Sequence, residues 1–379
     1  MNYVQLREMC CITMGQSPNS DSYNEEREGV PFFQGNADFG ERYPSVRTWC
    51  KEPKKMAKNG DVLISVRAPI GAINYARETC CIGRGLAALS PKTDKVSKEF
   101  IFWVMKSRCK ELQMKGTGST FKAISKKILE EVKIPLYPLE KQIEYSLVLE
   151  KVYAIIETYK SELQKLDELI QARFVEMFGE PTTNLKGWDE FALSEKLNVV
   201  GGYAFKSNQF DEISGIPILR IGNINAGFFK PVNLVYWKED DNLERYAMYP
   251  GDLVMSLTGT VGKDDYGNVC ILGNDYEMYY LNQRNAKLEI KEGLDKYYLS
   301  HLLKFEQIKK RLTGISRGVR QANISNKDIL NLVVPVPPIE LQNQFADFVN
   351  QVNKSKVEIQ KALEKTQLLF DSLMQQYFG

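Results

Sequence analysis

Hydrophobic positions along the chain follow two kinds of pattern, and each kind occurs in both halves. Short apolar runs rich in β-branched and aromatic residues, separated by glycine and proline, predict β-strands. Longer segments, in which apolar residues recur at alternating steps of four and three, predict helices that pack along a coiled-coil seam. In the first half we expect strands at 3–6, 30–34, 61–66, 72–75 and 86–89, and helices at 97–114 and 139–178.

The second half of the chain repeats the first about 200 residues later. The segment 124–142 recurs as 324–342, and the pair 178–179 recurs as 378–379. This period is too long for a solenoid, whose units span about 20–50 residues. The repeat therefore predicts a duplicated domain with an attached helix. Matched positions include Ile124/Ile324, Ser125/Ser325, Lys127/Lys327, Pro135/Pro335, Glu140/Glu340 and Gln142/Gln342.

Each long helical segment carries one apolar seam. Residues 139–178 and 339–378 contain no glycine or proline, and about 40 residues at roughly 1.5 Å each would span about 60 Å. Because each helix has one seam, we expect the two to pair with each other. The seam can serve core packing alone, or packing together with a role as spacer and docking surface. The seam residues are Val152, Ile156, Tyr159, Leu163, Leu166 and Ile170, then Val352, Ile359, Leu363, Thr366, Phe370, Leu373 and Tyr377.

Proline and glycine mark the boundaries between these parts. Pro135 and Pro138 favour an extended entry into the first long helix, because proline restricts the preceding residue and lacks an amide proton. The expected fold is α+β: two tandem mixed α/β domains separated by two long helices, which pair as an antiparallel coiled coil in a pseudo-two-fold internal repeat. The expected parts are a first domain at 1–138, a helix at 139–178, a linker and second domain at 179–338, and a helix at 339–379.

Composition places the chain among ordinary globular proteins. It has 379 residues, of which 43% are hydrophobic and 26% charged, as in typical globular domains. Apolar runs stay short of the roughly 20 residues that span a membrane, and the start lacks the layout of a secretory signal. We therefore expect no membrane contact and a cytoplasmic location.

Charge is distributed unevenly between the helices and the rest of the chain. Residues 139–178 carry 8 acidic and 5 basic side chains, and residues 339–378 carry 5 and 4. The rest therefore has a formal charge of +6, although the whole chain has +2. This excess gives mild support for phosphate contact outside the helices.

Metal sites and histidine chemistry are not expected. The seven cysteines include the adjacent pairs Cys10-Cys11 and Cys80-Cys81 but no CxxC motif, whereas zinc sites need spaced pairs or added histidines. We interpret the cysteines as buried, reduced strand residues. His301, the single histidine, is expected at the surface or in packing.

Catalytic motifs are also missing from the sequence. The loop 116–120 lacks the spacing of a phosphate-binding P-loop, and the Gly-Lys pair at 262–263 is followed by Asp264 rather than Ser or Thr. The Pro-Pro pair at 337–338 follows Val336, not the Asn or Asp of an adenine methyltransferase motif. We therefore expect the chain alone not to be an enzyme.

The repeated motifs and their order along the chain resemble those of a known family. Two diverged α/β domains, each ending in the motif of 124–142 or 324–342 before a long helix, resemble the DNA-specificity subunit of type I restriction–modification systems. The second half adds the segments 202–207, 221–224 and 251–253, which look like the signatures of that family's target-recognition domains. The first half departs from this pattern, with Met-Gly-Gln-Ser-Pro at 14–18.

The resemblance implies a non-catalytic DNA reader within a larger complex. Each domain would read one half of a bipartite, asymmetric site in double-stranded DNA, with half-sites about 34–36 Å apart. The helices would set the unread gap and dock two methyltransferase (modification) subunits, and restriction (endonuclease/translocase) subunits would join them. The chain itself would need no cofactor, because S-adenosylmethionine and ATP with Mg²⁺ would be bound by the partner subunits.

Candidate DNA contacts are polar residues in the turn-rich loops. Arg can bind guanine with two hydrogen bonds, and Asn or Gln can bind adenine in the same way. For each of them, a solvated loop residue is an equally good interpretation, and the glycine-rich loop 314–320 is the best single candidate. In the first half they are Gln16, Ser17, Asn19, Gln34, Asn36, Arg67, Arg84, Ser119 and Lys122; in the second, Lys206, Ser207, Asn208, Arg220, Asn223, Arg284, Arg317, Arg320 and Gln321.

Two other function classes remain as alternatives. A non-enzymatic coiled-coil adaptor with two protein- or glycan-binding domains would show no salt-dependent DNA affinity. A self-sufficient nuclease or methyltransferase would be active as the purified chain alone, and the missing motifs argue against it.

Overall fold

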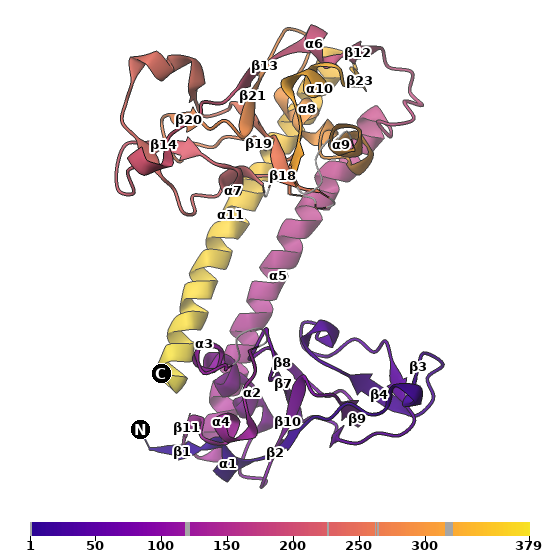
Figure 1. The fold of residues 1–379 in the computed structure, drawn as a ribbon, viewed down its shortest axis with the longest axis vertical. Coiled ribbons are helices and arrows are strands. Elements are labelled where there is room, and N and C mark those ends of the chain that lie inside the picture. The colour runs from indigo at the N-terminus through magenta and orange to yellow at the C-terminus, as the bar shows by residue number, and fades with distance from the viewer. Residues whose placement is uncertain (1, 118–121, 226, 262, 264, 315–320) are drawn as a thin grey trace. The chain divides into compact units, whose positions relative to one another are not determined.

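The computed structural model describes residues 2–117, 122–225, 227–261, 263, 265–314 and 321–379. The chain forms two compact units, which we call unit 1 (Met1–Ser161 with Gln360–Gly379) and unit 2 (Glu162–Ile359). Two 40-residue helices, α5 (Leu139–Phe178) and α11 (Ile339–Phe378), each contribute residues to both units (Figure 1).

The described residues of unit 1 form three sheets, with strand orders β1-β11, β2-β10-β7-β8 and β3-β5-β4-β9-β6. In the five-stranded sheet, β4 and β9 are parallel, whereas the other pairs are antiparallel. The strands are β1 (Tyr3–Gln5), β2 (Cys10–Met14), β3 (Tyr23–Asn24), β4 (Val30–Phe33), β5 (Trp49–Cys50), β6 (Met56–Ala57), β7 (Val62–Ser65), β8 (Ile73–Tyr75), β9 (Cys80–Ile82), β10 (Leu86–Pro91) and β11 (Lys133–Pro135). The helices other than α5 and α11 are α1 (Leu6–Met9), η1 (Ser20–Ser22), η2 (Asn36–Asp38), α2 (Lys98–Ser107), α3 (Cys109–Met114) and α4 (Lys126–Glu130).

Alternation along the central strands of unit 1 builds a three-layered structure. In β7, Val62 and Ile64 join a core with α2, whereas Leu63 joins a second core with β4 and β9. Successive side chains of a strand point to opposite faces, so the four-stranded sheet lies between the helices and the five-stranded sheet (Figure 1). Both faces are buried, which explains the continuous apolar runs in the sequence.

Unit 2 repeats most of this topology, although its second sheet has four described strands rather than five and the pair β18-β22 is added. Its sheet β13-β21-β17-β19 corresponds to β2-β10-β7-β8, and its sheet β15-β14-β20-β16 again contains a parallel pair, β14 with β20. The strands are β12 (Glu190–Ala192), β13 (Leu197–Gly201), β14 (Ile216–Leu219), β15 (Tyr236–Trp237), β16 (Ala247–Met248), β17 (Leu253–Ser256), β18 (Thr258–Thr260), β19 (Val269–Ile271), β20 (Tyr279–Leu281), β21 (Asn285–Ile290), β22 (Gln321–Asn323) and β23 (Val333–Pro335). The helices are α6 (Leu193–Lys196), η3 (Ser207–Gln209), α7 (Ile221–Ile224), η4 (Asp241–Tyr246), α8 (Lys296–Leu302), α9 (Glu306–Thr313) and α10 (Asn326–Leu330).

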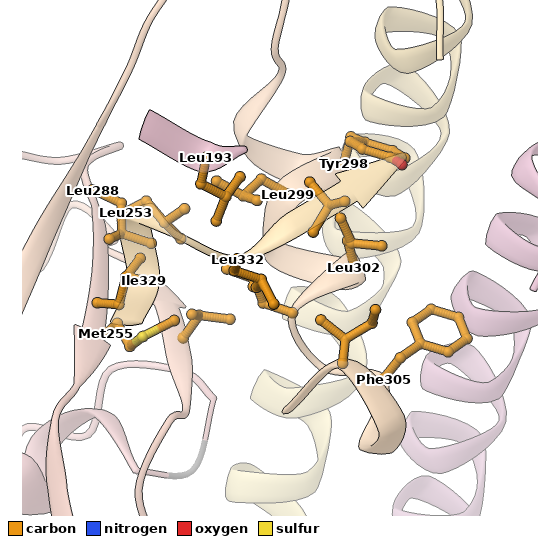
Figure 2. Packing of buried hydrophobic residues seen from close by; sticks show 14 of the residues in the cluster. Leu193, Leu253, Met255, Leu288, Tyr298, Leu299, Leu302, Phe305, Ile329 and Leu332 are labelled. Carbon is orange, nitrogen blue, oxygen red and sulfur yellow. The ribbon is translucent and has the colours of Figure 1, made fainter. Parts of the chain in front are cut away.

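The main core of unit 2 joins its sheet to α8, α9 and the long helices. Figure 2 shows Leu253 and Met255 of β17 directed toward Ile329 and Leu332, with Phe305 at the side of α5. Phe174 of α5 reaches this core, with its ring 5.0 Å from that of Phe305.

The two long helices run antiparallel within each unit. In unit 1, Tyr145 stacks on Tyr377 with ring centroids 4.0 Å apart, and Tyr153 lies 6.0 Å from Phe370. In unit 2, Asp167 pairs with Lys356 at 2.6 Å, and the Phe174 ring lies 5.4 Å from that of Phe345. In both units, residues with higher numbers on α5 contact residues with lower numbers on α11, as expected for the predicted antiparallel pairing.

The repeated Ile-Ser motif starts a short helix in both units. Ser125 caps α4, its hydroxyl accepting the Ile128 amide proton. Ser325 caps α10 in the same way, and the Asp328 carboxylate accepts the Ser325 amide proton at 2.8 Å. An N-cap hydroxyl satisfies one of the amide groups left free at a helix start, so this motif fixes where each helix begins.

The repeated glutamine also has one structural role in both copies. The Gln142 side chain accepts the Ser97 amide proton at 2.9 Å, and that of Gln342 accepts the Asp295 amide proton at 2.7 Å. Both glutamines are buried. Each therefore fastens the first turn of a long helix to the start of α2 or α8.

The duplicated α+β fold is confirmed, with several differences in detail. The predicted helix 97–114 is two helices separated at Arg108, whose guanidinium donates to the Phe378 carbonyl at 2.5 Å. Cys11 is exposed and Cys109 is half-buried in a helix, so the expectation of buried strand cysteines is wrong for these two. His301 is a packing residue, with its ring 5.3 Å from that of Phe345.

Candidate nucleic-acid interface

Loops of unit 1 meet beyond the ends of β2, β4, β7 and β9. The Gln16 amide donates to the Ile82 carbonyl at 2.9 Å, and the Gly85 amide donates to the Gln34 carbonyl at 3.1 Å. The Val66 amide donates to the Gly85 carbonyl at 2.9 Å. We call this meeting point the first junction, made of residues 15–17, 34–36, 66–67, 83–85 and 122–123.

Unit 2 contains the same arrangement. The Tyr203 amide donates to the Leu281 carbonyl, and the Leu257 amide donates to the Arg284 carbonyl, both at 2.8 Å. These bonds correspond to those of Gln16 and Val66 in unit 1. We call this the second junction, made of residues 202–204, 220–223, 257–258, 282–285 and 323–324.

A glycine lets two backbone segments cross closely in each junction. A Cβ on Gly15 would lie 2.0 Å from the Gly83 carbonyl oxygen, and one on Gly202 would lie 2.1 Å from that of Asn282. Such distances exclude any side chain unless the backbone moves. The two junctions are thus built by the same close approach.

Most first-half candidates gather at the first junction. Arg84 sits beside Ser17, whose hydroxyl accepts the Arg84 amide proton at 3.4 Å. Asn19 lies just beyond, where its side chain accepts a proton from the Lys54 ammonium at 3.3 Å. Ser119 lies outside the described residues. The candidates at the junction are Gln16, Ser17, Gln34, Asn36, Arg67, Arg84 and Lys122; Ser17 and Asn36 are half-buried and the others exposed.

The second-half candidates are more dispersed. Arg220, Asn223 and Arg284 belong to the second junction, whereas exposed Lys206, Ser207 and Asn208 lie at η3, a few residues further along. The backbone of Gln321 pairs with Thr260 in the β18–β22 ladder. Arg317 and Arg320, in the loop regarded as the best candidate, lie outside the described residues.

Asn223 is not available for DNA contact, contrary to expectation. Its side chain is 2% exposed. The carbonyl accepts the Arg220 amide proton at 3.0 Å, and the amide group donates to the carbonyls of Lys230 and Val232. Asn223 therefore holds the loop that follows α7. In the first junction, Asp38 binds the Gln34 amide in a comparable way, at 2.7 Å.

Two residues of the second junction were not among the candidates predicted from the sequence. Tyr203 and Gln283 are exposed and occupy the second junction, and the Gln283 amide donates to the Tyr203 carbonyl at 2.9 Å. Alignment of Gly15 with Gly202 would have placed Tyr203 opposite the candidate Gln16.

Aromatic and basic groups lie together at the first junction. Burial raises the pKa of the Tyr23 phenol, and the neighbouring Arg84 guanidinium opposes that shift. The Tyr23 ring stacks on Phe32 with centroids 4.7 Å apart, and its hydroxyl donates to the Pro18 carbonyl. The backbone that carries Arg84 and Ser17 thus rests on a packed aromatic pair.

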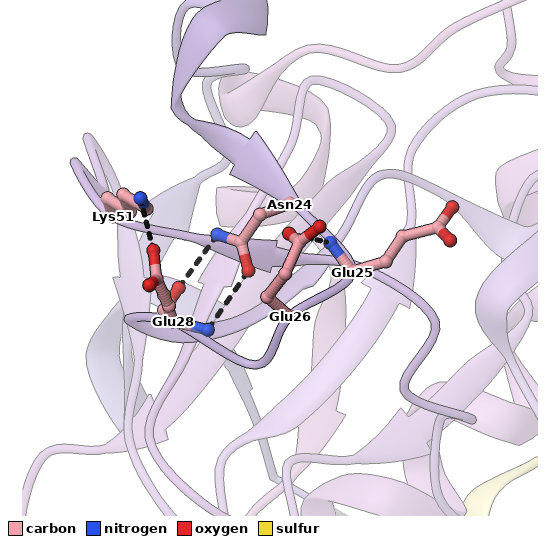
Figure 3. Close-up of polar contacts among 5 residues, drawn as sticks. All are labelled: Asn24, Glu25, Glu26, Glu28 and Lys51. Atoms are coloured by element: carbon pink, nitrogen blue, oxygen red, sulfur yellow. Dashed lines mark hydrogen bonds and ion pairs between the residues drawn. The ribbon is translucent and has the colours of Figure 1, made fainter.

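The tip that follows β3 is acidic. Figure 3 shows that the Asn24 side chain closes this turn by hydrogen bonds to both backbone groups of Glu28, while the Glu28 carboxylate pairs with Lys51. Glu25 and Glu26 add two more carboxylates. Because carboxylates repel phosphates, Glu25 and Glu26 are poor candidates for DNA contact.

Neither a metal site nor a membrane segment was found in the described part of the chain. The His, Cys, Asp and Glu residues placed there do not form groups of three that could hold a metal ion. The helices described there are too short or too polar to cross a membrane.

Comparison with known proteins identifies relatives. The family model for the type I restriction modification DNA specificity domain matches residues 1–168 and 185–368. The putative type I restriction enzyme MjaX specificity subunit of Methanocaldococcus jannaschii is 44% identical over 157 residues, which span 41% of this chain and 37% of that protein. The MjaVIII specificity subunit of the same organism is 27% identical over 307 residues, spanning 74% of this chain and 71% of the relative.

Solved structures share the fold. The type I restriction-modification S subunit from M. genitalium aligns with a TM-score of 0.59 at 16% identity, covering 100% of this chain and 96% of the other. A chain from a structure of type I R-M complex assembly and conformational transition aligns with a TM-score of 0.53 at 18% identity, covering 100% and 97%. With the family model matched over both halves, the chain belongs to the type I restriction modification DNA specificity family.

Proposed function

We propose that this chain is the DNA-reading subunit of a type I restriction–modification complex, and that each unit reads one half of a bipartite, asymmetric site. The observation that carries this proposal is the duplicated junction. The same hydrogen-bonded frame occurs in both units, with Arg84 exposed on the first junction and Arg284 on the second. Exposed Arg and Gln side chains on a fixed backbone suit the reading of base edges.

The long helices are proposed to set the gap between half-sites and to dock two methyltransferase subunits. Each helix has 40 residues, which corresponds to about 60 Å. Large apolar side chains remain exposed on both helices within unit 1, including Leu147 on α5 and Leu368 on α11. Exposed apolar groups on otherwise charged helices suit burial against a partner protein.

The chemistry is assigned to the partners. Methyltransferase subunits would bind S-adenosylmethionine, and restriction subunits would bind ATP with Mg²⁺ and act as endonuclease and translocase. This chain would supply the positioning of double-stranded DNA, without a cofactor of its own. A complex that acts on cellular DNA in this way would work in the cytoplasm.

Co-expression with a type I methyltransferase (modification) subunit tests the proposal. Genome-wide methylation mapping should yield a bipartite motif with an unread gap, and the methyltransferase alone should leave the genome unmethylated at that motif. Binding of the assembled complex to DNA should weaken steeply with salt, because phosphate contacts release counterions. A continuous motif, or unchanged methylation, would contradict the proposal; DNA affinity independent of salt would favour a protein- or glycan-binding adaptor.

A further inference from the structure

Two pairs of positions in the junctions are structurally equivalent but carry different side chains. Ile82 ends β9 and Leu281 ends β20, and each accepts the amide proton of the residue after the crossing glycine. That residue is Gln16 in unit 1 and Tyr203 in unit 2. Their equivalence therefore follows from backbone hydrogen bonds rather than from sequence similarity.

The second pair lies in the turn that follows these strands. Three residues separate β9 from β10, and three separate β20 from β21. Arg84 is the middle residue of the first turn, and Gln283 is the middle residue of the second. Their backbones are held differently, since the Arg84 amide donates to the Ser17 hydroxyl and the Gln283 amide to the Tyr203 carbonyl. Both turns nevertheless lie directly against the segment that carries the first position.

The side chains at these four positions are exposed, and the Tyr203 ring is also held by aromatic neighbours. Gln16, Arg84 and Gln283 are exposed, and Tyr203 is 39% exposed. The Tyr203 ring is braced by Phe205 and Tyr246, with centroids 4.9 and 5.3 Å away. Because a braced side chain loses little conformational freedom on binding, Tyr203 is suited to specific recognition, whereas Gln16, Arg84 and Gln283 offer hydrogen-bonding groups on a fixed backbone.

We propose that positions 16 and 84 in unit 1, and positions 203 and 283 in unit 2, determine which base pairs each half-site contains. This inference rests on the proposed function. Arg84 would bind the O6 and N7 atoms of a guanine, and Gln16 would bind the N6 and N7 atoms of an adenine. In unit 2, Gln283 would bind an adenine beside a base against which Tyr203 packs.

The frame explains how two copies of one fold read different sequences. The backbone around Gly15 and Gly202 makes equivalent hydrogen bonds, so it presents the first position in the same way in both units. Replacement of a side chain there changes the donors and acceptors offered to DNA and leaves the frame intact. The two half-sites therefore differ because Gln and Arg in unit 1 are replaced by Tyr and Gln in unit 2.

The test uses the full-length chain in complex with its methyltransferase. Arg84→Gln should remove discrimination at a single guanine of the half-site read by unit 1, reducing the preference for that base about 5- to 150-fold. The other half-site should keep its sequence. Adding Gln16→Tyr should alter a second position of the same half-site. Methylation mapping, with binding to DNA duplexes that carry single base changes, measures both effects.

Control variants distinguish a loss of base recognition from a general loss of DNA affinity. Arg7→Ala removes an exposed cation from α1, which lies at the opposite end of β2, and should leave the motif unchanged. Arg84→Lys keeps the charge but replaces the planar two-pronged guanidinium by a single ammonium group, so it should weaken the preference for guanine while the salt dependence of binding stays the same. This milder variant keeps the proposal testable if the double variant does not fold.

The outcomes distinguish the inference from the function on which it rests. A wild-type complex without a bipartite motif refutes the proposed function itself. A bipartite wild-type motif that persists in the Arg84→Gln variant overturns the inference alone. Uniform weakening of binding across all duplexes also overturns it, because that result indicates a phosphate contact.

Discussion

At the residue scale, burial and bonding decide which polar side chains are available. Asn223 and Gln16 belong to similar turn-rich stretches, yet the first is buried with its amide bonded within the protein, whereas the second is exposed. Sequence identifies amide residues but not the direction of their side chains, because that direction depends on backbone contacts with distant segments. For this reason the sequence did not predict that Asn223 is buried or that Tyr203 is exposed at the second junction.

Gly15 provides a test of the crossing in the first junction. A Cβ there would lie 2.0 Å from the Gly83 oxygen, so Gly15→Ala should lower the free energy of unfolding by about 1–3 kcal/mol, as overpacking does elsewhere. Gly35→Ala is a matched control, because a Cβ there meets no atom within 4 Å and the backbone is extended. Denaturant unfolding that gives equal values for both variants would contradict the crossing.

At the element scale, patterns predicted the central strands better than the outer sheets. The runs 61–66 and 86–89 became β7 and β10, because both of their faces are buried. Strands such as β3 and β5 have two residues each, too few for alternation to be recognised. At the break between α2 and α3, Arg108 contacts Phe378, 270 residues away, and local periodicity carries no information on such a contact.

Lys106 of α2 gives an element-level prediction on pH dependence. Burial lowers its pKa to about 8, with Arg42 adding to the shift while Glu157 and Glu150 oppose it, against 10.5 for a free lysine. Between these values the unfolded chain binds more protons than the folded one, so this lysine makes stability rise with pH from about 8 to 10.5. Lys106→Met should remove this pH dependence. It should also raise the free energy of unfolding by about 1 kcal/mol at pH 7, where the wild type buries a charge.

Denaturant unfolding of wild type and variant from pH 7 to 10 measures this difference. Comparison of the two proteins is needed because other groups also make stability depend on pH in this range. Cys80 is one, since a free cysteine thiol has a pKa of 9.0 and burial raises the pKa of Cys80 to about 12. Lys110→Met, on the exposed surface of α3, should retain the wild-type slope. If Lys106→Met and wild type gave parallel curves, Lys106 would not carry a lowered pKa.

At the scale of the whole molecule, the chain is not divided where its sequence pattern changes. The repeat suggests boundaries at the prolines before each long helix, whereas the compact units are residues 1–161 with 360–379, and residues 162–359. The helices belong to the cores of both units, because Phe370 lies 5.6 Å from Trp103 and Phe178 lies 4.8 Å from Tyr298. A heptad seam predicts that a helix packs against another helix, but it does not show which domain core each part of the helix joins.

Truncation after Ile359 should therefore affect the two units unequally. It removes Phe370 and Phe378 from the core of unit 1, and loss of a single buried Phe side chain costs about 3–5 kcal/mol. Hydrogen exchange should show lost protection in β10 and retained protection in β21. Phe370→Ala should produce a milder form of the same difference. Equal loss in both strands would show that the units do not fold separately.

The discontinuity of unit 1 also bears on the order in which the protein folds during synthesis. Residues 1–161 leave the ribosome first, but the strip 360–379 that covers Trp103 and Phe100 follows about 200 residues later, roughly 10–40 s at common rates of translation. The residues of unit 2 are consecutive and all emerge before that strip. Unit 2 can therefore complete its core before unit 1 does. Until residues 360–379 are made, the aromatic side chains of unit 1 that they cover stay exposed and accessible to chaperones.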